Sequence, residues 1–386
     1  MIQDNRITII PRIYQTAQAD FGTMVDQLLN VYVAIGVPIR LIFFASSSNN
    51  STYMQQFAKL KEKVGCYFPA HTPLVSYVAQ PVAGDGMVME VHEVKVPPTA
   101  VVYYGYQVNL PYITIASDSY KYMFLSGIVG NVLQDSIRMQ ALSVFQQVSN
   151  LLKVEGFSVS DIIRQWNYIE HITQYDADGH QHYQDFNEVR SHFYADAVWE
   201  NGYPAATGIG TECGGVMVDM DLLQCDERVC QIDKVDNPCQ VAAYQYSQSM
   251  LLGKSDFGQK ETPKFERAKM VWRQGEGLIY LSGTAAISGE VSIEAQEVVK
   301  QLDMTLNNLA SLLSKENLKN VSQQTVTEVQ LLYVRVYVKH RHDAPLVKRK
   351  LTAYYPTLPA IYTIADICRS ELLLEIEGMA VVHGEN

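Results

Sequence analysis

The feature that most constrains the fold of this chain is an acid-bearing apolar segment that occurs three times. Residues 87–94, 216–223 and 373–380 each have the composition of a β-strand, with an acid at the matching position: Glu90, Asp219 and Glu375. Alternate side chains of a strand share a face, so each acid shares its face with a polar residue two positions later: His92, Asp221 and Glu377. A polar row in an apolar strand predicts a solvated face, a groove or a sheet edge.

The segments around these strands also recur in a common order. A long helix is predicted over residues 20–35, 132–154 and 293–313, and a second helix over 52–64, 186–199 and 345–355. A strand separates the two helices of each third, at residues 39–45, 162–172 and 326–338. The tripeptide Leu-Ser-Gly at 125–127 opens the second third and recurs at 281–283 in the last. The chain is therefore predicted to contain three similar units.

Repetition of this kind predicts the fold class. One unit buries one face of its sheet under its own helices, and the other copies must cover the remaining face. We expect an α+β fold in which three repeats form a pseudo-trimer with central sheets and outer helices, imitating a closed homotrimer within a monomer. The predicted boundaries are 1–110 for a divergent first repeat, 111–225 for the second, 226–270 for an inserted connector or lid, and 271–386 for the third.

Composition limits the class of partner. The 386 residues carry a net charge of −11 and 47% of them are hydrophobic, so a sizeable core is expected and neither nucleic acid nor an anionic membrane is a predicted partner. The longest apolar region, residues 28–45, is interrupted by Asn30, Pro38 and Arg40, which argues against a membrane-spanning helix. Six cysteines without a C-x-x-C pair, and an N-terminus unlike a signal peptide, predict reduced thiols in the cytoplasm.

The histidines and cysteines do not predict a metal site. His180 and His182 form one pair and His340 and His342 another, and neither pair has further ligands at metal-binding spacing. The cysteines of the middle region are spaced too irregularly for zinc. No metal and no cofactor is therefore expected.

Several short motifs in the second and third units resemble a known family. They are Trp-Asn-Tyr-Ile at 166–169, Phe-Asn-Glu-Val-Arg at 186–190, Pro-Ala-Ala-Thr-Gly-Ile-Gly at 204–210, Asn-Pro-Cys-Gln at 237–240, Phe-Glu-Arg-Ala at 265–268, Ser-Gly-Thr-Ala at 282–285 and Asp-Ile-Cys-Arg at 366–369. The repeat unit resembles the RidA/YjgF superfamily, commonly homotrimers with ligand clefts between subunits. The ordered set of motifs resembles one branch of that superfamily, the chorismatases, which cleave the enolpyruvyl ether of chorismate.

The resemblance implies a catalytic glutamate at Glu375, within the run Leu-Leu-Leu-Glu-Ile-Glu. Cleavage of an enol ether near neutral pH requires an acid with a raised pKa, which burial and a second nearby carboxylate would provide. Cys368 matches a position where some chorismatases carry a cysteine linked to the formation of 3-hydroxybenzoate in place of a dihydrodiol. The alternatives are a solvated acid at a strand edge for Glu375 and a small buried thiol for Cys368.

A substrate with two carboxylates requires cationic or hydrogen-bonding partners. Five arginines lie in or near the matching motifs, and any of them could bind a carboxylate: Arg190, Arg267, Arg335, Arg349 and Arg369. Tyr244 and Asn187 are further candidates. Of the arginines, Arg267 and Arg349 are favoured, because one adjoins the connector and the other lies on the helix before the closing strands. Asn187 could equally be a helix-surface residue.

Two positions depart from the family pattern. Cys239 stands where an arginine is usual, which removes a carboxylate partner, and Glu290 would repel a dianionic substrate if it lay close by. Two functions are therefore open: a chorismatase-like enzyme that releases pyruvate and a hydroxybenzoate or dihydroxycyclohexadiene carboxylate, or a RidA-like binding protein or imine hydrolase. The segment Pro-Ala-Ile-Tyr at 359–362 lacks the arginine of imine-deaminating members, which argues against 2-aminoacrylate deamination.

Overall fold

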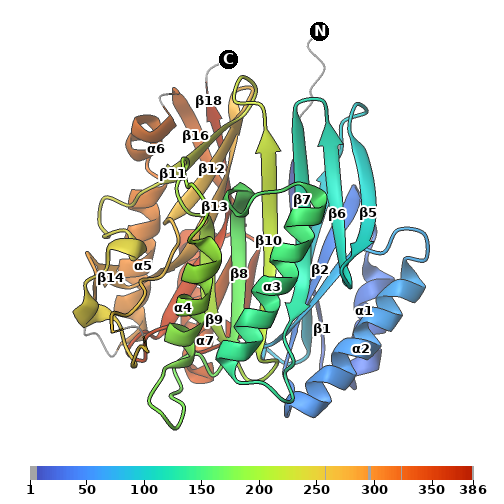
Figure 1. The fold of residues 1–386 in the computed structure, drawn as a ribbon. Helices are drawn as coiled ribbons and strands as arrows, with labels where there is room; N and C mark the ends of the chain where they lie inside the picture. The colour runs from blue at the N-terminus through green and yellow to red at the C-terminus, as the bar shows by residue number, and fades with distance from the viewer. Residues whose placement is uncertain (1–6, 257, 294–296, 323, 385–386) are drawn as a thin grey trace.

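A computed structural model describes residues 7–256, 258–293, 297–322 and 324–384. Three β-sheets stand side by side, with helices on their outer sides and both ends of the chain at the same end of the molecule (Figure 1). The start of the chain, from which the absence of a signal peptide was predicted, lies outside the described residues, as do residues 294–296 of the helix predicted at 293–313.

The first sheet is built by the first unit. Its elements are β1 (Thr8–Thr16), α1 (Phe21–Val31), β2 (Val37–Ala45), α2 (Asn50–Tyr67), β3 (Leu74–Ala79) and β4 (Met87–Lys95), in the strand order β1-β4-β2-β3. The prediction missed β1. Helix α1 ends earlier than expected because the buried Glu93 accepts hydrogen bonds from the Tyr32 hydroxyl (2.5 Å) and the Ile35 amide (3.0 Å), which holds these residues outside the helix.

The second sheet has six strands in the order β5-β6-β7-β10-β8-β9. Its elements are β5 (Val101–Gln107), β6 (Leu110–Ser117), β7 (Tyr120–Val129), α3 (Ile137–Glu155), β8 (Ile162–Glu170), α4 (His182–Tyr194), β9 (Ala205–Thr211) and β10 (Val216–Cys225). Helix α3 begins later than predicted, because the Ser136 hydroxyl caps it by accepting from the Met139 amide. The β5–β6 hairpin was not predicted, and the boundary placed at 110/111 falls inside it.

The third sheet has the order β11-β12-β13-β18-β16-β17. Its elements, with a small two-stranded sheet, are β11 (Gln231–Val235), β12 (Ala268–Arg273), β13 (Glu276–Ala285), β14 (Ile287–Ser288), β15 (Val291–Ser292), α5 (Val298–Leu312), α6 (Lys315–Ser322), β16 (Val326–Val338), α7 (Ala344–Tyr354), β17 (Ala360–Ile364) and β18 (Leu374–Gly384). Helix α6 was not predicted. Strand β11 lies within the stretch predicted as a connector, so part of that stretch belongs to the sheet.

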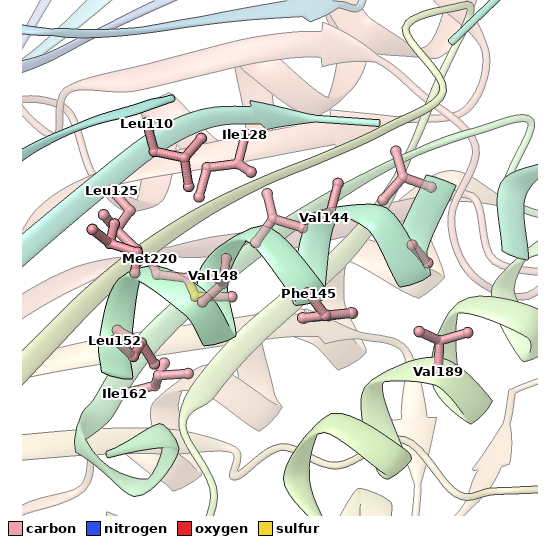
Figure 2. Packing of buried hydrophobic residues seen from close by; sticks show 14 of the residues in the cluster. Leu110, Leu125, Ile128, Val144, Phe145, Val148, Leu152, Ile162, Val189 and Met220 are labelled. Carbon is pink, nitrogen blue, oxygen red and sulfur yellow. The ribbon is translucent and has the colours of Figure 1, made fainter. Parts of the chain in front are cut away.

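Four strands of each sheet share one order: β1-β4-β2-β3, β7-β10-β8-β9 and β13-β18-β16-β17. Each sheet packs one face against its own helices; Figure 2 shows Val144, Val148 and Leu152 in the cluster that joins α3 to the second sheet. The opposite faces of all three sheets meet in two further apolar clusters. The sheets are therefore central, and the helices lie outside them.

Between these two clusters lies a group of charges that the structure buries, contrary to the predicted solvated face. The arginines Arg40, Arg164 and Arg335 occupy equivalent positions, directly opposite His92, Asp221 and Glu377 on the neighbouring strand. Arg40 binds Asp221, Arg164 binds Glu377, and Arg335 binds both Glu90 and Glu377. Every one of these side chains is at most 1% exposed. We call these three arginines and their acids the buried ring; it links each sheet to the next.

No helix in the described parts of the chain is long and apolar enough to cross a membrane.

Candidate active site

A cavity lies where the second unit meets the third. Its walls come from α4, β9, β13 and β18, and it is covered by residues 246–252 and 263–267 of the predicted connector. The space between the surrounding atoms, including the part open to solvent, is about 700 Å³. The connector therefore covers the cavity as a lid would.

Glu375 lies in this cavity on strand β18 and is 4% exposed. On the adjacent strand β13, a Cβ at Gly283 would lie 2.1 Å from Glu375 Oε1, so the glycine makes room for the carboxyl group. Among the residues that the structure describes, none donates a hydrogen bond to this carboxyl group. Burial and, secondarily, the charge of Glu377 raise the pKa of Glu375 to about 8, against the opposing effects of Arg164 and Arg267. Glu375 is therefore mainly protonated at neutral pH.

Two arginines supply positive charge to the cavity. Arg267 is 4% exposed and donates to the Tyr246 hydroxyl (2.7 Å) and the Val241 carbonyl, while its Nε has no partner among the described residues. Arg369 is 7% exposed and donates to the Glu290 carbonyl (2.8 Å) and the Ser292 hydroxyl (3.1 Å). Both guanidinium groups lie near the Tyr246 ring, at 5.6 and 5.1 Å from its centroid. The cavity thus combines a protonated acid with two cations.

Of the other predicted residues, Cys368 and Asn187 line the cavity and Arg190 stands behind it. Arg190 Nη2 donates to Asn187 Oδ1 at 2.7 Å, which fixes the orientation of the amide toward the cavity. Burial, reinforced by the nearby Glu375, raises the pKa of Cys368 to about 12. The sulfur is therefore a neutral thiol at neutral pH, and a thiolate nucleophile is not expected there.

Arg349 and Tyr244 are not among the residues that line the cavity. Arg349 is exposed on α7, and the Tyr244 hydroxyl instead accepts from Lys234 Nζ at 3.3 Å. Tyr246 takes the place expected for Tyr244, because the intervening short 3-10 turn, Ala243–Gln245, directs the two rings differently. The prediction also missed Tyr183 and favoured Arg349 over Arg369. The position of Arg369 directly after Cys368 was the available signal.

The two departures from the family pattern lie away from the cavity lining. Cys239 is exposed, and its Sγ lies 3.4 Å from the Ser311 hydroxyl. The Glu290 carboxylate accepts from the amide and hydroxyl of Ser247, at 2.8 Å each. Glu290 does not line the cavity, and its side chain instead binds the first part of the lid.

One group of potential metal ligands occurs in the described residues. Ligand atoms of Asp176, His180 and Asp185 lie within 4.8 Å of one another. Asp185 already binds Arg138 Nη1 at 3.2 Å, and Asp176 is exposed. The group lies outside the residues lining the cavity, so the chemistry of Glu375 does not involve it.

Known proteins resemble this chain in sequence and in fold. Residues 111–220 match the family described as chorismatase FkbO/Hyg5-like, N-terminal. A 3-hydroxybenzoate synthase from Streptomyces hygroscopicus is 31% identical over 278 residues, which cover 70% of this chain and 76% of the relative. A chorismatase from Streptomyces rapamycinicus is 29% identical over 248 residues, or 61% of this chain and 68% of that protein. A crystal structure of a chorismatase shares the fold, with a TM-score of 0.70 at 22% identity over 96% of this chain and 98% of that one. The chain therefore belongs to the chorismatase family.

Proposed function

We propose that this protein cleaves the enolpyruvyl ether of chorismate, with Glu375 as the general acid. The observation that carries the proposal is a buried carboxyl group that keeps its proton near pH 7, in one cavity with two arginines. The relatives named chorismatase and 3-hydroxybenzoate synthase support this choice of substrate. The products are pyruvate and either a hydroxybenzoate or a dihydroxycyclohexadiene carboxylate.

Protonation is the step that the site is suited to perform. The Glu375 O–H adds its proton to the terminal methylene carbon of the enol ether, and the ether oxygen stabilises the resulting cation. In the hydrolytic route, water adds to this cation and loses a proton to the Glu375 carboxylate. The bond between the hemiketal carbon and the oxygen attached to the ring then breaks: this oxygen takes a proton from the reprotonated Glu375, the hemiketal hydroxyl gives its proton back to the Glu375 carboxylate, and the products are pyruvate and the ring diol. The hydroxybenzoate differs from this diol by the loss of one water molecule.

The surroundings of Glu375 provide for the charges of such a substrate. Arg267 and Arg369 are placed to bind its carboxylates, and the unpartnered Nε of Arg267 is a free donor for one of them. Asn187, held by Arg190, is proposed to orient the ring. Cys368 lies against Glu375 as a neutral thiol, and we retain the predicted link between this position and the hydroxybenzoate product.

The assembly proposed for this enzyme is a monomer whose three units imitate the subunits of a trimer. Three facts support it: the common order of four strands, the equivalent positions of the three arginines, and the cyclic linkage of the sheets by the buried ring. Each unit supplies one side of two interfaces. The reaction is proposed for one of these interfaces only.

Release of pyruvate tests the function. Purified protein is incubated with chorismate, and pyruvate is measured through lactate dehydrogenase while the aromatic product is identified by chromatography. We expect turnover by the wild type and a loss of about 10²- to 10⁴-fold in Glu375→Gln, which removes a general acid without changing the shape of its side chain. If chorismate raises the melting temperature of the protein but no pyruvate is released, the proposed enzymatic activity is refuted and a RidA-like binding function is supported.

A further inference from the structure

We propose that Glu377 is a positioning residue for the reaction: a fixed anion that binds the nearby donors itself and so leaves Glu375 as the proton donor. The proposal rests on the function given above to Glu375. It assigns a role to the second acid of the strand, which lies in the buried ring and is not among the residues lining the cavity.

Glu377 is held by donors from three different strands. It accepts from Arg335 Nη1 (3.0 Å) and the Tyr337 hydroxyl on β16, from Arg164 Nη2 on β8, and from the Thr207 hydroxyl on β9. The side chain is 1% exposed. Two guanidinium contacts and two hydroxyl donors fix both the position and the negative charge of this carboxylate.

In the equivalent interface between the first and second units, the corresponding hydroxyl and amide bind the first acid of the strand and not the second. Ser76 occupies the position of Thr207, since each lies two residues beyond the partner of its arginine in the parallel strand pair. The Ser76 hydroxyl contacts Asp219, the equivalent of Glu375, at 2.7 and 2.8 Å from its two oxygens. The Gly127 amide donates to the same carboxylate at 2.7 Å. In that interface these two donors lower the pKa of Asp219, although burial, the largest influence, raises it overall.

In the interface that contains the cavity, those donors do not reach the equivalent acid. The Thr207 hydroxyl donates to Glu377 and accepts from Arg164 Nη2 at 2.8 Å, and the same Nη2 binds Glu377. The hydroxyl and this Nη2 are thus bound to the second acid, while Nε and Nη1 of Arg164 have no partner among the described residues. Gly283, the equivalent of Gly127, lies against Glu375 without a hydrogen bond to it among the described atoms. Thr207 and Arg164 therefore donate no hydrogen bond to Glu375 among the described atoms, and Arg164 acts on it through its charge alone.

The charged and titratable groups around Glu375 come from every element packed on it. They are Glu377 on its own strand, Arg164 on β8, Arg267 at the end of the lid, Tyr183 on α4, and Cys368 before β18. After burial, the charge of Glu377 is the largest influence that raises the pKa of Glu375, and the two arginines lower it. Without the anion at Glu377, Arg164 would lose its partner, and both changes would favour ionised Glu375.

The test is a titration of Glu375 that does not depend on turnover. Protein labelled with ¹³C at the glutamate carboxyl carbons is titrated by NMR, and the Glu375 signal is identified by its absence in Glu375→Gln. We expect a midpoint near pH 8 in the wild type, a midpoint lower by about one pH unit or more in Glu377→Gln, and little change in the charge-conserving Glu377→Asp. An unchanged midpoint in folded Glu377→Gln would overturn the proposal.

If Glu377→Gln does not fold, the proposal is tested with the wild type and Glu375→Gln alone. In the wild type the signal titrating near pH 8 must belong to Glu375, and its persistence in Glu375→Gln would overturn the proposal. With chorismate, the acid form is active, so pyruvate release is lost as the pH rises through the pKa of Glu375. In folded Glu377→Gln, we expect the pH at which pyruvate release is half lost to fall together with the NMR midpoint. A shifted midpoint in protein that releases no pyruvate would refute the proposed function and leave the effect of Glu377 on Glu375 established.

Discussion

The interface between the first and second units and the interface between the second and third are built from equivalent strands, yet one is filled and the other holds a cavity. Tyr77 on β3 and Gly208 on β9 occupy equivalent positions, each three residues beyond the partner of the buried arginine. Tyr77 is fully buried and stacks on Tyr53 of α2, with ring centroids 5.0 Å apart. Gly208 has no side chain and lines the cavity next to Tyr183 of α4.

The acids of the two interfaces differ in their hydrogen bonds. Asp219 receives hydrogen bonds from Ser76 and Gly127, whereas Glu375 faces an open space with its donors bound elsewhere. In the remaining interface, Arg335 contacts both oxygens of Glu90 at 2.7 Å and, although burial opposes it, holds the pKa of Glu90 well below its usual range. Of the three repeated acids, Glu375 thus lies at an open cavity, whereas Asp219 and Glu90 are held by hydrogen bonds or an ion pair.

The largest expected effect comes from breaking the ion pair that closes the filled interface. Asp221→Asn leaves the buried Arg40 without its carboxylate, and we expect the free energy of unfolding to fall by about 3–5 kcal/mol. Asp26→Asn is the matched control, because the Lys63–Asp26 pair has the same 2.7 Å separation at the surface and is worth less than about 1 kcal/mol. Denaturant unfolding measures both variants. Equal losses would contradict the structural role given to the buried ring.

The next largest effect is expected when Gly208 of the open interface is replaced by tyrosine, the residue at the equivalent position of the filled interface. Gly208→Tyr places a ring in the cavity beside Tyr183, where even a Cβ would lie 2.9 Å from the Tyr183 ring. We expect pyruvate release to fall by about 100-fold or more, because the substrate can no longer take its position against Glu375. Tyr77→Phe changes the filled interface and is expected to leave turnover intact. Normal activity in Gly208→Tyr would place the reaction elsewhere.

A smaller effect is expected at the arginines. Arg267→Lys keeps the charge but loses the planar set of donors, so we expect KM to rise by about tenfold. Arg349→Lys makes the same exchange on the exposed face of α7 and should leave KM unchanged. Steady-state kinetics of the two variants separates an arginine of the cavity from one that the sequence favoured equally.

The sequence predicted most of the long helices and central strands, because long helices and buried apolar strands leave clear periodic patterns. It missed β1 and the β5–β6 hairpin, since such edge segments are less uniformly apolar and their place depends on partners far away in the chain. Glu375, Cys368, Arg267 and Asn187 were placed together through family motifs. Tyr246 was missed, and Arg369 was a candidate but not a favoured one, because the direction of a side chain in a lid or loop depends on local turns that residue types do not fix.

The burial of the polar rows could not be predicted from one strand at a time. Each row looks solvated alone, and its partners come from a different unit, as Arg40 and Asp221 illustrate at a separation of 181 residues. Only the assembled sheets bring the opposite charges together. The same assembly decides which of the repeated acids faces a cavity.

The most direct test of the central claim compares two isosteric variants at equivalent positions, Glu375→Gln and Asp219→Asn. Pyruvate release from chorismate is measured at pH 7 for each, with thermal unfolding to establish that both are folded. The predicted result is a loss of about 10²- to 10⁴-fold for Glu375→Gln and activity close to the wild type for Asp219→Asn. Equal losses in the two folded variants, or full activity in Glu375→Gln, would contradict the assignment of the chemistry to one interface and one acid.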